Sequence, residues 1–199
     1  MPKSAPRRNS ALSPEYALLG FLGQHPAHGY DLHQQLTSHL GQIWHISLSQ
    51  TYNILARLEE QGFIAGVVQE QDKLPDRRRF RLTAAGRRRF ESWLAATAGC
   101  SVRLIRVEFT TRLFFAQALD VETIHKVIDS QITETRNCLQ HLQTMLIDLP
   151  TEQTFNRLGL ELRIRQLNSV VDWIIQCGQV VESLSAKSAE REVKKNIFK

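Results

Sequence analysis

Residues 46–62 carry a helix-start signal at one end and a helix-stop signal at the other. Ser47 and Gln50 have the spacing of a capping box, in which the serine side chain accepts from the Gln50 amide and Gln50 reaches back. Gly62 stands where a helix ends in the left-handed conformation that glycine adopts at least cost. The stretch is therefore predicted to be one amphipathic helix, with a buried face at helical spacing made of Leu48, Thr51, Tyr52, Leu55 and Leu58.

The opposite face of this helix is polar. Gln50, Asn53 and Arg57 follow one another at its surface, with Ser49 beside them. Amides and a cation in such a row can hydrogen-bond base edges in a DNA major groove. A polar helix face is more often simply solvated, so the neighbouring segments decide between the two interpretations.

The neighbouring segments follow an order typical of a winged helix-turn-helix. A first helix is predicted to open at residues 13–15 with a cap, a proline and an acid, and a second to span 29–40. After the helix at 46–62, alternating patterns predict strands at 63–68 and 77–82, and Thr83 is placed to cap a fourth helix. We therefore expect a mainly α fold whose N-terminal part has a two-stranded β wing and whose third helix enters the major groove.

The predicted wing is rich in arginine. Seven arginines fall within thirteen residues, with no acid among them: Arg77, Arg78, Arg79, Arg81, Arg87, Arg88 and Arg89. The net charge is +5, and 12 of the 25 Lys and Arg against 8 of the 20 Asp and Glu lie in residues 1–99. Such a cluster repels itself unless a polyanion offsets it, although salt screens a solvated surface. We expect Lys73 and Arg77–Arg79 to contact the DNA backbone, whereas Arg87–Arg89 can simply cover the fourth helix.

Several segments in this order resemble one family of proteins. They are LeuLeuGlyPheLeu (18–22), HisGlyTyrAspLeu (28–32), TyrAsnIleLeuAlaArgLeuGluGluGlnGlyPheIle (52–64), ArgPheArgLeuThrAlaAlaGly (79–86) and ArgValGluPheThrThrArgLeuPhePhe (106–115). Together they resemble the PadR family of bacterial transcriptional regulators. The resemblance implies a homodimeric regulator, usually a repressor, whose DNA affinity changes when small molecules bind.

The resemblance also assigns roles to individual residues. It places His28 and Tyr30 at the start of the second helix, where they can meet phosphate. A core position is the equal alternative for Tyr30, and Tyr52 can combine packing with one phosphate contact. Leu48-Ser49-Gln50-Thr51 departs from the Pro-Gly-(Ser/Thr)-Leu of many members, so base-reading rules do not transfer there. The predicted DNA-contacting residues are thus Ser47, Ser49, Gln50, Tyr52, Asn53, Arg57, His28, Tyr30, Lys73, Arg77, Arg78 and Arg79.

The second half of the chain carries two heptad patterns. Apolar residues alternate by three and four along two segments separated by Pro150. Because such helices are longer than a winged domain can cover, we predict a coiled-coil-like homodimer interface made of Ile128, Ile132, Leu139, Leu142, Leu146, Leu160, Ile164, Leu167, Val171, Ile174 and Val181. The predicted organisation is a disordered arm at 1–11, a winged domain at 12–99, a helical dimerisation and effector domain at 100–185 and a flexible tail at 186–199.

The sequence also bears on other chemistry. No catalytic or nucleotide-binding motif and no zinc spacing occurs, so we expect neither an enzyme nor a metal or other cofactor. No apolar run approaches the ~20 residues of a membrane span, and the first ten residues lack the apolar segment of a signal peptide, so we expect a cytoplasmic protein. Cys100, Cys138 and Cys177 are isolated and odd in number, which predicts reduced thiols. A redox-sensing role for Cys100 is conceivable, but buried packing is commoner for cysteine.

Three tryptophans complete the candidate residues. Trp44, Trp93 and Trp173 are predicted to line a pocket for a small aromatic effector, because flat aromatic walls suit aromatic ligands. Core packing is the stronger alternative for Trp93 and an equal one for Trp173. The function predicted overall is sequence-specific binding of double-stranded DNA by a homodimer that recognises an inverted repeat. The alternatives are a winged-helix protein-interaction adaptor and a ligand-binding module.

Overall fold

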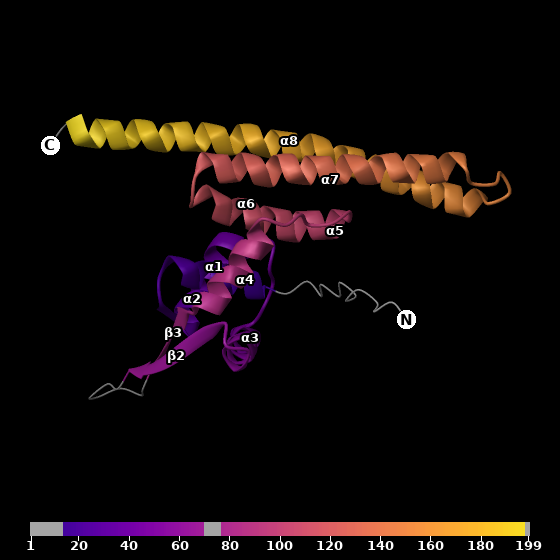
Figure 1. The fold of residues 1–199 in the computed structure, drawn as a ribbon. Coiled ribbons are helices and arrows are strands. Elements are labelled where there is room, and N and C mark those ends of the chain that lie inside the picture. The colour runs from indigo at the N-terminus through magenta and orange to yellow at the C-terminus, as the bar shows by residue number, and fades with distance from the viewer. Residues whose placement is uncertain (1–13, 70–76, 198–199) are drawn as a thin grey trace. The chain divides into compact units, whose positions relative to one another are not determined.

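The computed structural model describes residues 14–69 and 77–197 of the chain, which fall into two compact units (Figure 1). The first unit ends at Trp93 and the second begins at Leu94. Helices dominate both, which confirms the predicted mainly α fold. The predicted arm at 1–11 lies outside the described residues.

The first unit has the predicted order of elements and one additional strand. Its elements are α1 (Glu15–Gln24), β1 (Ala27–His28), α2 (Gly29–Leu40), α3 (Leu48–Glu60), β2 (Ile64–Gln69), β3 (Arg77–Leu82) and α4 (Ala84–Leu94). The strands form an antiparallel sheet in the order β1-β3-β2, so the wing hairpin is extended by a third strand. β1 was missed because a strand of two residues has no alternating pattern to detect.

One core joins the helices and the sheet of this unit. Its fully buried side chains include Leu18, Leu32, Leu55 and Leu58 from three helices and Ile64 from β2. α4 continues directly from the sheet: the Thr83 hydroxyl accepts from the amide of Gly86 at 3.1 Å, as predicted for a helix cap. A Cβ at Gly86 would lie 2.0 Å from the carbonyl oxygen of Phe63, so only glycine allows α4 to pack this closely on the start of β2.

The second unit consists of one composite helix and a long helical hairpin. Its elements are α5 (Val102–Leu104), the π-helical turn η1 (Ile105–Phe109), α6 (Thr110–Gln117), α7 (Val121–Ile147) and α8 (Thr154–Ile197). The Asp120 side chain accepts from the amide of Thr123 at 2.7 Å and caps α7. α8 continues as helix to Ile197, where we expected a flexible tail after residue 185.

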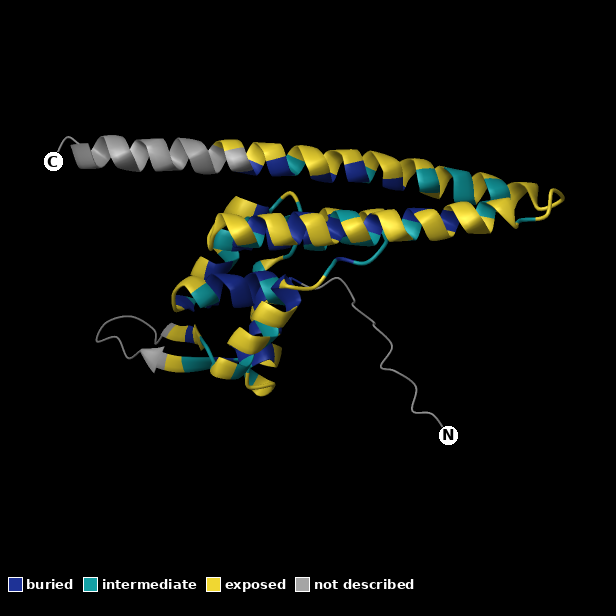
Figure 2. Ribbon diagram, turned by 45° about the horizontal axis from the view of Figure 1, so that its top comes forward, coloured by how far each residue is buried: buried dark blue, intermediate teal, exposed yellow. Residues whose placement is uncertain are grey.

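The heptad residues pack inside one chain, which corrects their predicted role as the dimer interface. α7 and α8 lie side by side and their buried residues face each other (Figure 2). The seam residues Ile128, Leu139, Leu142, Leu167, Val171, Ile174 and Val181 are buried in this core, and Ile132, Leu160 and Ile164 are partly buried against it. Leu146 is half-buried. A heptad pattern shows that a face is covered; here α7 and α8 of the same chain cover each other.

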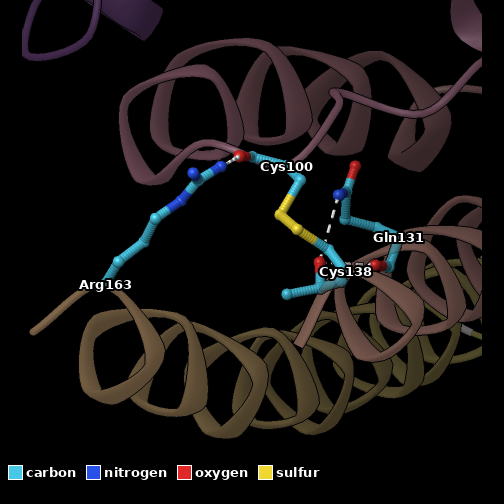
Figure 3. The surroundings of a disulfide bond; sticks show 5 residues. Cys100, Gln131, Cys138 and Arg163 are labelled. Carbon is cyan, nitrogen blue, oxygen red and sulfur yellow. Dashed lines mark hydrogen bonds between the residues drawn. A yellow bond between two sulfur atoms is a disulfide. The ribbon is translucent and has the colours of Figure 1, made fainter. Parts of the chain in front are cut away.

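A disulfide in the second unit corrects the prediction of three reduced thiols. Cys100 and Cys138 are bonded, with their Cα atoms 6.2 Å apart (Figure 3). Their separation of 38 residues gave no sign of the pairing in the sequence. Cys177 on α8 is a free thiol, as predicted.

Candidate nucleic-acid interface

Hydrogen bonds fix both ends of α3. Ser47 Oγ accepts from the Gln50 amide at 3.2 Å, and Gln50 Oε1 accepts from the Ser47 amide at 2.8 Å, which confirms the predicted capping box. At the other end Gly62 has φ +74°, and the amides of Gly62 and Phe63 donate to the carbonyls of Glu59 and Leu58. This is a Schellman motif, so the helix is defined at both ends by its own residues.

The outer face of α3 presents short side chains to solvent. Ser49, Asn53 and Ala56 are exposed, and their spacing of four and three residues places them on one face. Sequence reasoning missed Ala56, whose methyl group lets a partner approach closely and suits contact with a thymine methyl. Tyr52 was predicted on the buried face but is 46% exposed, whereas Ile54, which was not predicted there, is buried.

The capping box restricts what Gln50 can offer to DNA. A backbone N–H is only a donor, so the Gln50 side chain must turn its oxygen toward Ser47 to close the box. The amide NH2 remains as the outward group, and it can donate but not accept. Pairing with adenine requires one donor and one acceptor, so Gln50 is suited to acceptors such as guanine N7 and O6 or thymine O4.

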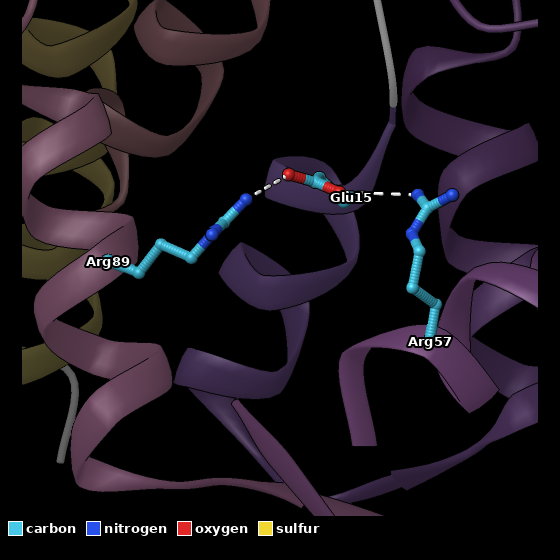
Figure 4. A network of polar contacts seen from close by, with 3 residues as sticks. All are labelled: Glu15, Arg57 and Arg89. Carbon is cyan, nitrogen blue, oxygen red and sulfur yellow. Dashed lines mark hydrogen bonds and ion pairs between the residues drawn. The ribbon is translucent and has the colours of Figure 1, made fainter. Parts of the chain in front are cut away.

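Arg57 is held by an acid that the sequence pattern did not reveal. Glu15 on α1 accepts from Arg57 at 3.3 Å and also from Arg89 on α4, so it lies between the two guanidinium groups (Figure 4). Its carboxylate is only 12% exposed, whereas the Arg57 side chain is half-exposed. Arg57 therefore anchors α3 to α1, and a DNA contact would compete with this pairing.

The wing arginines are partly neutralised rather than free. Arg78 donates to Glu59 at 2.8 Å and lies over the Phe80 ring, 5.7 Å from its centroid. Glu59 also accepts from the Gly66 amide at 2.8 Å, so it ties the end of α3 to both wing strands. Arg79 donates to the carbonyl of Pro26. The predicted uncompensated cluster is thus corrected at Arg78 and Arg89, which Glu59 and Glu15 approach.

Arg77 and Lys73 were the other predicted backbone contacts on the wing. Arg77 pairs in register with Gln69 at the outer end of β3, and its side chain is not described. Lys73 lies outside the described residues. The exposed side chains of Arg78, Arg79 and Arg81 are therefore the described basic groups on the wing.

The start of α2 lies next to the wing and to α3. His28 caps α2 through its backbone position in β1, and its Nδ1 donates to the Arg78 carbonyl at 3.2 Å. Tyr30 is 51% exposed and its hydroxyl accepts from Gln34, which excludes the core alternative for this tyrosine. A Cβ at Gly29 would lie 2.5 Å from the Tyr52 ring, so Gly29 lets this ring approach α2. Both phenols remain available at the surface.

His33 was not among the predicted residues, yet it contacts the recognition helix. Its Nδ1 lies 3.0 Å from the hydroxyl of the buried Thr51, which itself donates to the Ser47 carbonyl at 3.2 Å. This chain of hydrogen bonds connects α2 to the first turn of α3. A histidine on a helix face gave no signal for such a partner, because the contact depends on how α2 and α3 pack.

The three tryptophans are divided between the units. Trp44 and Trp93 are buried in the first unit, where Trp93 stacks on Tyr16 with ring centroids 4.8 Å apart. Trp173 belongs to the second unit, is 37% exposed and meets the edge of Phe109. Core packing thus accounts for Trp44 and Trp93, and the effector pocket stays a prediction for which Trp173 is the accessible candidate.

The described residues contain neither a metal-binding cluster nor a membrane-spanning helix. Within residues that the structure describes, no three His, Cys, Asp or Glu side chains are grouped to hold a metal ion. Across the same part of the chain, no helix has the length and apolarity needed to cross a membrane.

The fold and this helix face define a winged helix-turn-helix protein. The sequence pattern of the transcriptional regulator PadR-like family matches residues 18–92, and that of the virulence activator alpha C-terminal family matches residues 105–182. The winged unit therefore carries the sequence pattern of the PadR-like family of transcriptional regulators.

The chain is also similar to individual proteins. The negative transcriptional regulator PadR of Bacillus subtilis (strain 168) is 26% identical over 129 residues, which cover 65% of this chain and 70% of that protein. The crystal structure of Bacillus subtilis PadR in complex with operator DNA is 22% identical, covers 84% of this chain and 98% of that one, and gives a TM-score of 0.42. The smu.1604c protein of Streptococcus mutans UA159 is 21% identical, covers 88% and 99% of the two chains, and gives a TM-score of 0.43.

Proposed function

We propose that this protein is a cytoplasmic repressor of transcription that binds an inverted repeat in double-stranded DNA as a homodimer. The observation that carries the proposal is the exposed row Ser49, Asn53 and Ala56 on a helix whose two ends are capped and whose inner face is buried. A rigid helix with short outward side chains can lie deep in a major groove. The relative named as a negative regulator supports the repressing sign.

The interface divides into base-reading and backbone-contacting groups. Asn53 and Ser49 carry the base reading, and Gln50 adds a donor at the start of the helix. Tyr30, Tyr52 and the wing arginines supply phosphate contacts, which position the helix without reading sequence. Arg78 has its charge offset by Glu59, so we assign it a smaller share of the counterion release than a free arginine.

A second apolar face on α8 supports the homodimer. Five exposed apolar residues recur along α8 at separations that place them on one side of the helix, away from the buried seam: Phe155, Leu158, Leu162, Trp173 and Val180. Phe155 is 89% exposed. We propose that a second copy of the chain covers this face, because a two-fold pair of recognition helices is what an inverted repeat requires.

Response to a small aromatic effector is the finer part of the proposal. Trp173 is the accessible tryptophan, and its edge contact with Phe109 leaves part of the indole exposed. It also lies on the proposed dimer face of α8, so an aromatic ligand stacking there would compete with or reshape the dimer contact. We therefore expect candidate aromatic compounds that quench Trp173 fluorescence to change DNA affinity.

Substitution of Asn53 tests the base-reading assignment. Asn53→Ala should weaken binding to a duplex that the protein selects from a random-sequence library by roughly 1–3 kcal/mol, the value of one good base contact. Binding to a scrambled duplex should stay unchanged, since phosphate contacts carry it. The measurement is a titration of labelled duplex at two salt concentrations.

Asn137→Ala supplies the matched control, because Asn137 is an exposed asparagine on α7 in the other unit. It should leave both affinities unchanged. Equal losses for the selected and scrambled duplexes in Asn53→Ala would remove Asn53 from the base-reading residues. Failure of the protein to show salt-dependent affinity for any duplex would favour the protein-interaction adaptor instead.

A further inference from the structure

The disulfide lies where the chain enters the second unit. α4 ends at Leu94, and residues 95–101 form the segment that connects it to α5. Cys100 is in this segment, next to Gly99, whose φ of +53° is in the left-handed region. Its partner Cys138 is on α7, so the bond fixes the connecting segment to the long hairpin (Figure 3).

Two other contacts hold the same segment without the disulfide. The Ala98 amide donates to the buried Gln131 side chain at 2.8 Å, and Gln131 also donates to Thr135 on α7. Arg163 on α8 donates to the Cys100 carbonyl at 3.3 Å. Because these contacts are independent of sulfur chemistry, the second unit should stay folded when the disulfide breaks. The segment near Gly99 should then be held in the same place but less firmly.

The three cysteines differ in their suitability for reversible chemistry. All three cysteines are partly exposed and pack against the second unit's core, but only Cys100 and Cys138 are paired. Burial raises the pKa of the Cys177 thiol, which lowers its thiolate fraction. The chain therefore combines a closely spaced pair with a third, unpaired thiol as an internal reference.

We propose that Cys100 and Cys138 form a reversible thiol–disulfide site through which a hydroperoxide changes the affinity of this protein for its operator. The inference rests on the proposed DNA-binding function, since a regulator of this kind works in the cytosol. Thiols are kept reduced there, and a disulfide that does form is usually transient or redox-sensing.

The oxidation balances with a hydroperoxide as the two-electron oxidant. One thiolate of the pair attacks the O–O bond, becomes a sulfenic acid and releases an alcohol, or water when the oxidant is hydrogen peroxide. The second thiolate attacks that sulfur, the S–S bond forms, and hydroxide leaves and takes up a proton to become water. A dithiol reverses the step by thiol–disulfide exchange and is itself oxidised to a disulfide.

The coupling to DNA follows from the position of the bond in the chain. A dimer reads two half-sites at a fixed spacing, so each winged unit must be joined to its helical unit with a suitable reach. Oxidation adds a covalent anchor two residues after the contact between Ala98 and Gln131, so the connecting segment leaves α7 less often. Reduction leaves that contact and the Arg163 hydrogen bond to hold the segment. The two forms should therefore differ in affinity for spaced half-sites and hardly at all for a scrambled duplex.

The test compares oxidised and reduced full-length protein. Hydrogen peroxide and dithiothreitol should interconvert the two forms in the folded protein, as followed by thiol alkylation and mass spectrometry, with circular dichroism unchanged. We expect a difference of at least about tenfold in affinity for the library-selected duplex, which is 1.4 kcal/mol. The sign of that difference identifies the form that fits the operator.

Cys138→Ser should abolish the peroxide response, and Cys177→Ser should retain it. Equal operator affinities for the two forms, a bond that dithiothreitol cannot reduce without unfolding, or a response that survives in Cys138→Ser would each overturn the proposal. The alkylation result is independent of DNA. If the bond cycles but no duplex is selected from the library, the proposed DNA-binding function has failed while the thiol pair remains reactive.

Discussion

α3 and α8 are both amphipathic helices, yet their sequences were informative to different degrees. The ends of α3 are set by residues within the helix and its two flanks: Ser47 and Gln50 at the start and Gly62 at the end. Its start and its stop were therefore correctly predicted. Its outward face was predicted in part, because Tyr52 is exposed and Ala56 was missed. The buried stripe of α8 was also recognised, but the partner that covers it was wrong, because α7 of the same chain packs against it.

The difference lies in the range of the interactions. Caps and left-handed glycines act within a few residues, so their geometry can be derived from spacing alone. A heptad pattern states only that one side of a helix is buried, and the same apolar side chains suit an intramolecular hairpin or a second subunit. α8 has two apolar sides, and only the contacts in the structure distinguish the covered side from the exposed one.

The largest expected effect separates the two sides of α8. Ile174→Ala should lower the free energy of unfolding by about 2–5 kcal/mol, because Ile174 is fully buried between α7 and α8. Leu162→Ala should cost far less, since Leu162 is 58% exposed within one chain. Urea unfolding of both variants at a fixed protein concentration provides the measurement.

The same face gives a second readout for assembly. Leu162→Glu should convert the proposed dimer into a folded monomer in sedimentation velocity, because it places a charge on the apolar contact. A variant that remains dimeric would show that α8 does not form the interface through this side. A large loss of stability in Leu162→Ala that does not depend on protein concentration would place Leu162 in the core.

A smaller effect separates capping from DNA contact in α3. Gln50→Glu retains an oxygen that can accept from the Ser47 amide, so the fold should keep its stability. Gln50→Ala removes that acceptor and should cost about 1 kcal/mol of unfolding free energy. Both changes remove the outward NH2, and the glutamate adds a negative charge near the DNA. We therefore expect specific affinity to fall by roughly 1–3 kcal/mol for alanine and by more for glutamate.

Thermal unfolding and duplex titration of the same two proteins provide the comparison. If Gln50→Ala loses stability but keeps its affinity for the selected duplex, then Gln50 serves the helix alone. If Gln50→Glu binds as well as the native protein, no base or phosphate lies near this side chain.

The smallest expected effect concerns the start of α7. Hydrogen bonds from the Thr123 backbone and then its side chain lower the pKa of the Asp120 carboxyl from its ordinary 3.8, and Lys126 adds a weaker contribution. Because the pKa is lowered in the folded state, the cap stabilises the helix fully above pH 3.8 and is lost as pH falls through the folded-state pKa. The Thr123 amide should then exchange faster with solvent, as NMR would show. Asp120→Asn keeps a capping oxygen and should lack this acid-dependent step; an equal step in both proteins would assign it elsewhere.

The sequence predicted most of the fold and a smaller part of the candidate site. Helix positions, the β2–β3 hairpin and the caps at Ser47 and Thr83 depend on local patterns, and these are confirmed. Arg57 pairs with Glu15 and Arg78 pairs with Glu59, and in each pair the acid is distant in sequence from the arginine. The Cys100–Cys138 bond likewise joins residues distant in sequence, and it forms only once α7 has packed against the segment that carries Cys100.

The capping box has a consequence for redesigning the DNA preference of this protein. Ser47 and Gln50 each complete the other's hydrogen bond, so a change at either position alters the energetics of both, and their substitution effects will not add. Among common residues, only glutamate can replace Gln50 and still close the box, and it is repelled by DNA. New operator preferences are therefore most accessible through Ser49 and Asn53, whose side chains can be varied without changing the start of the helix.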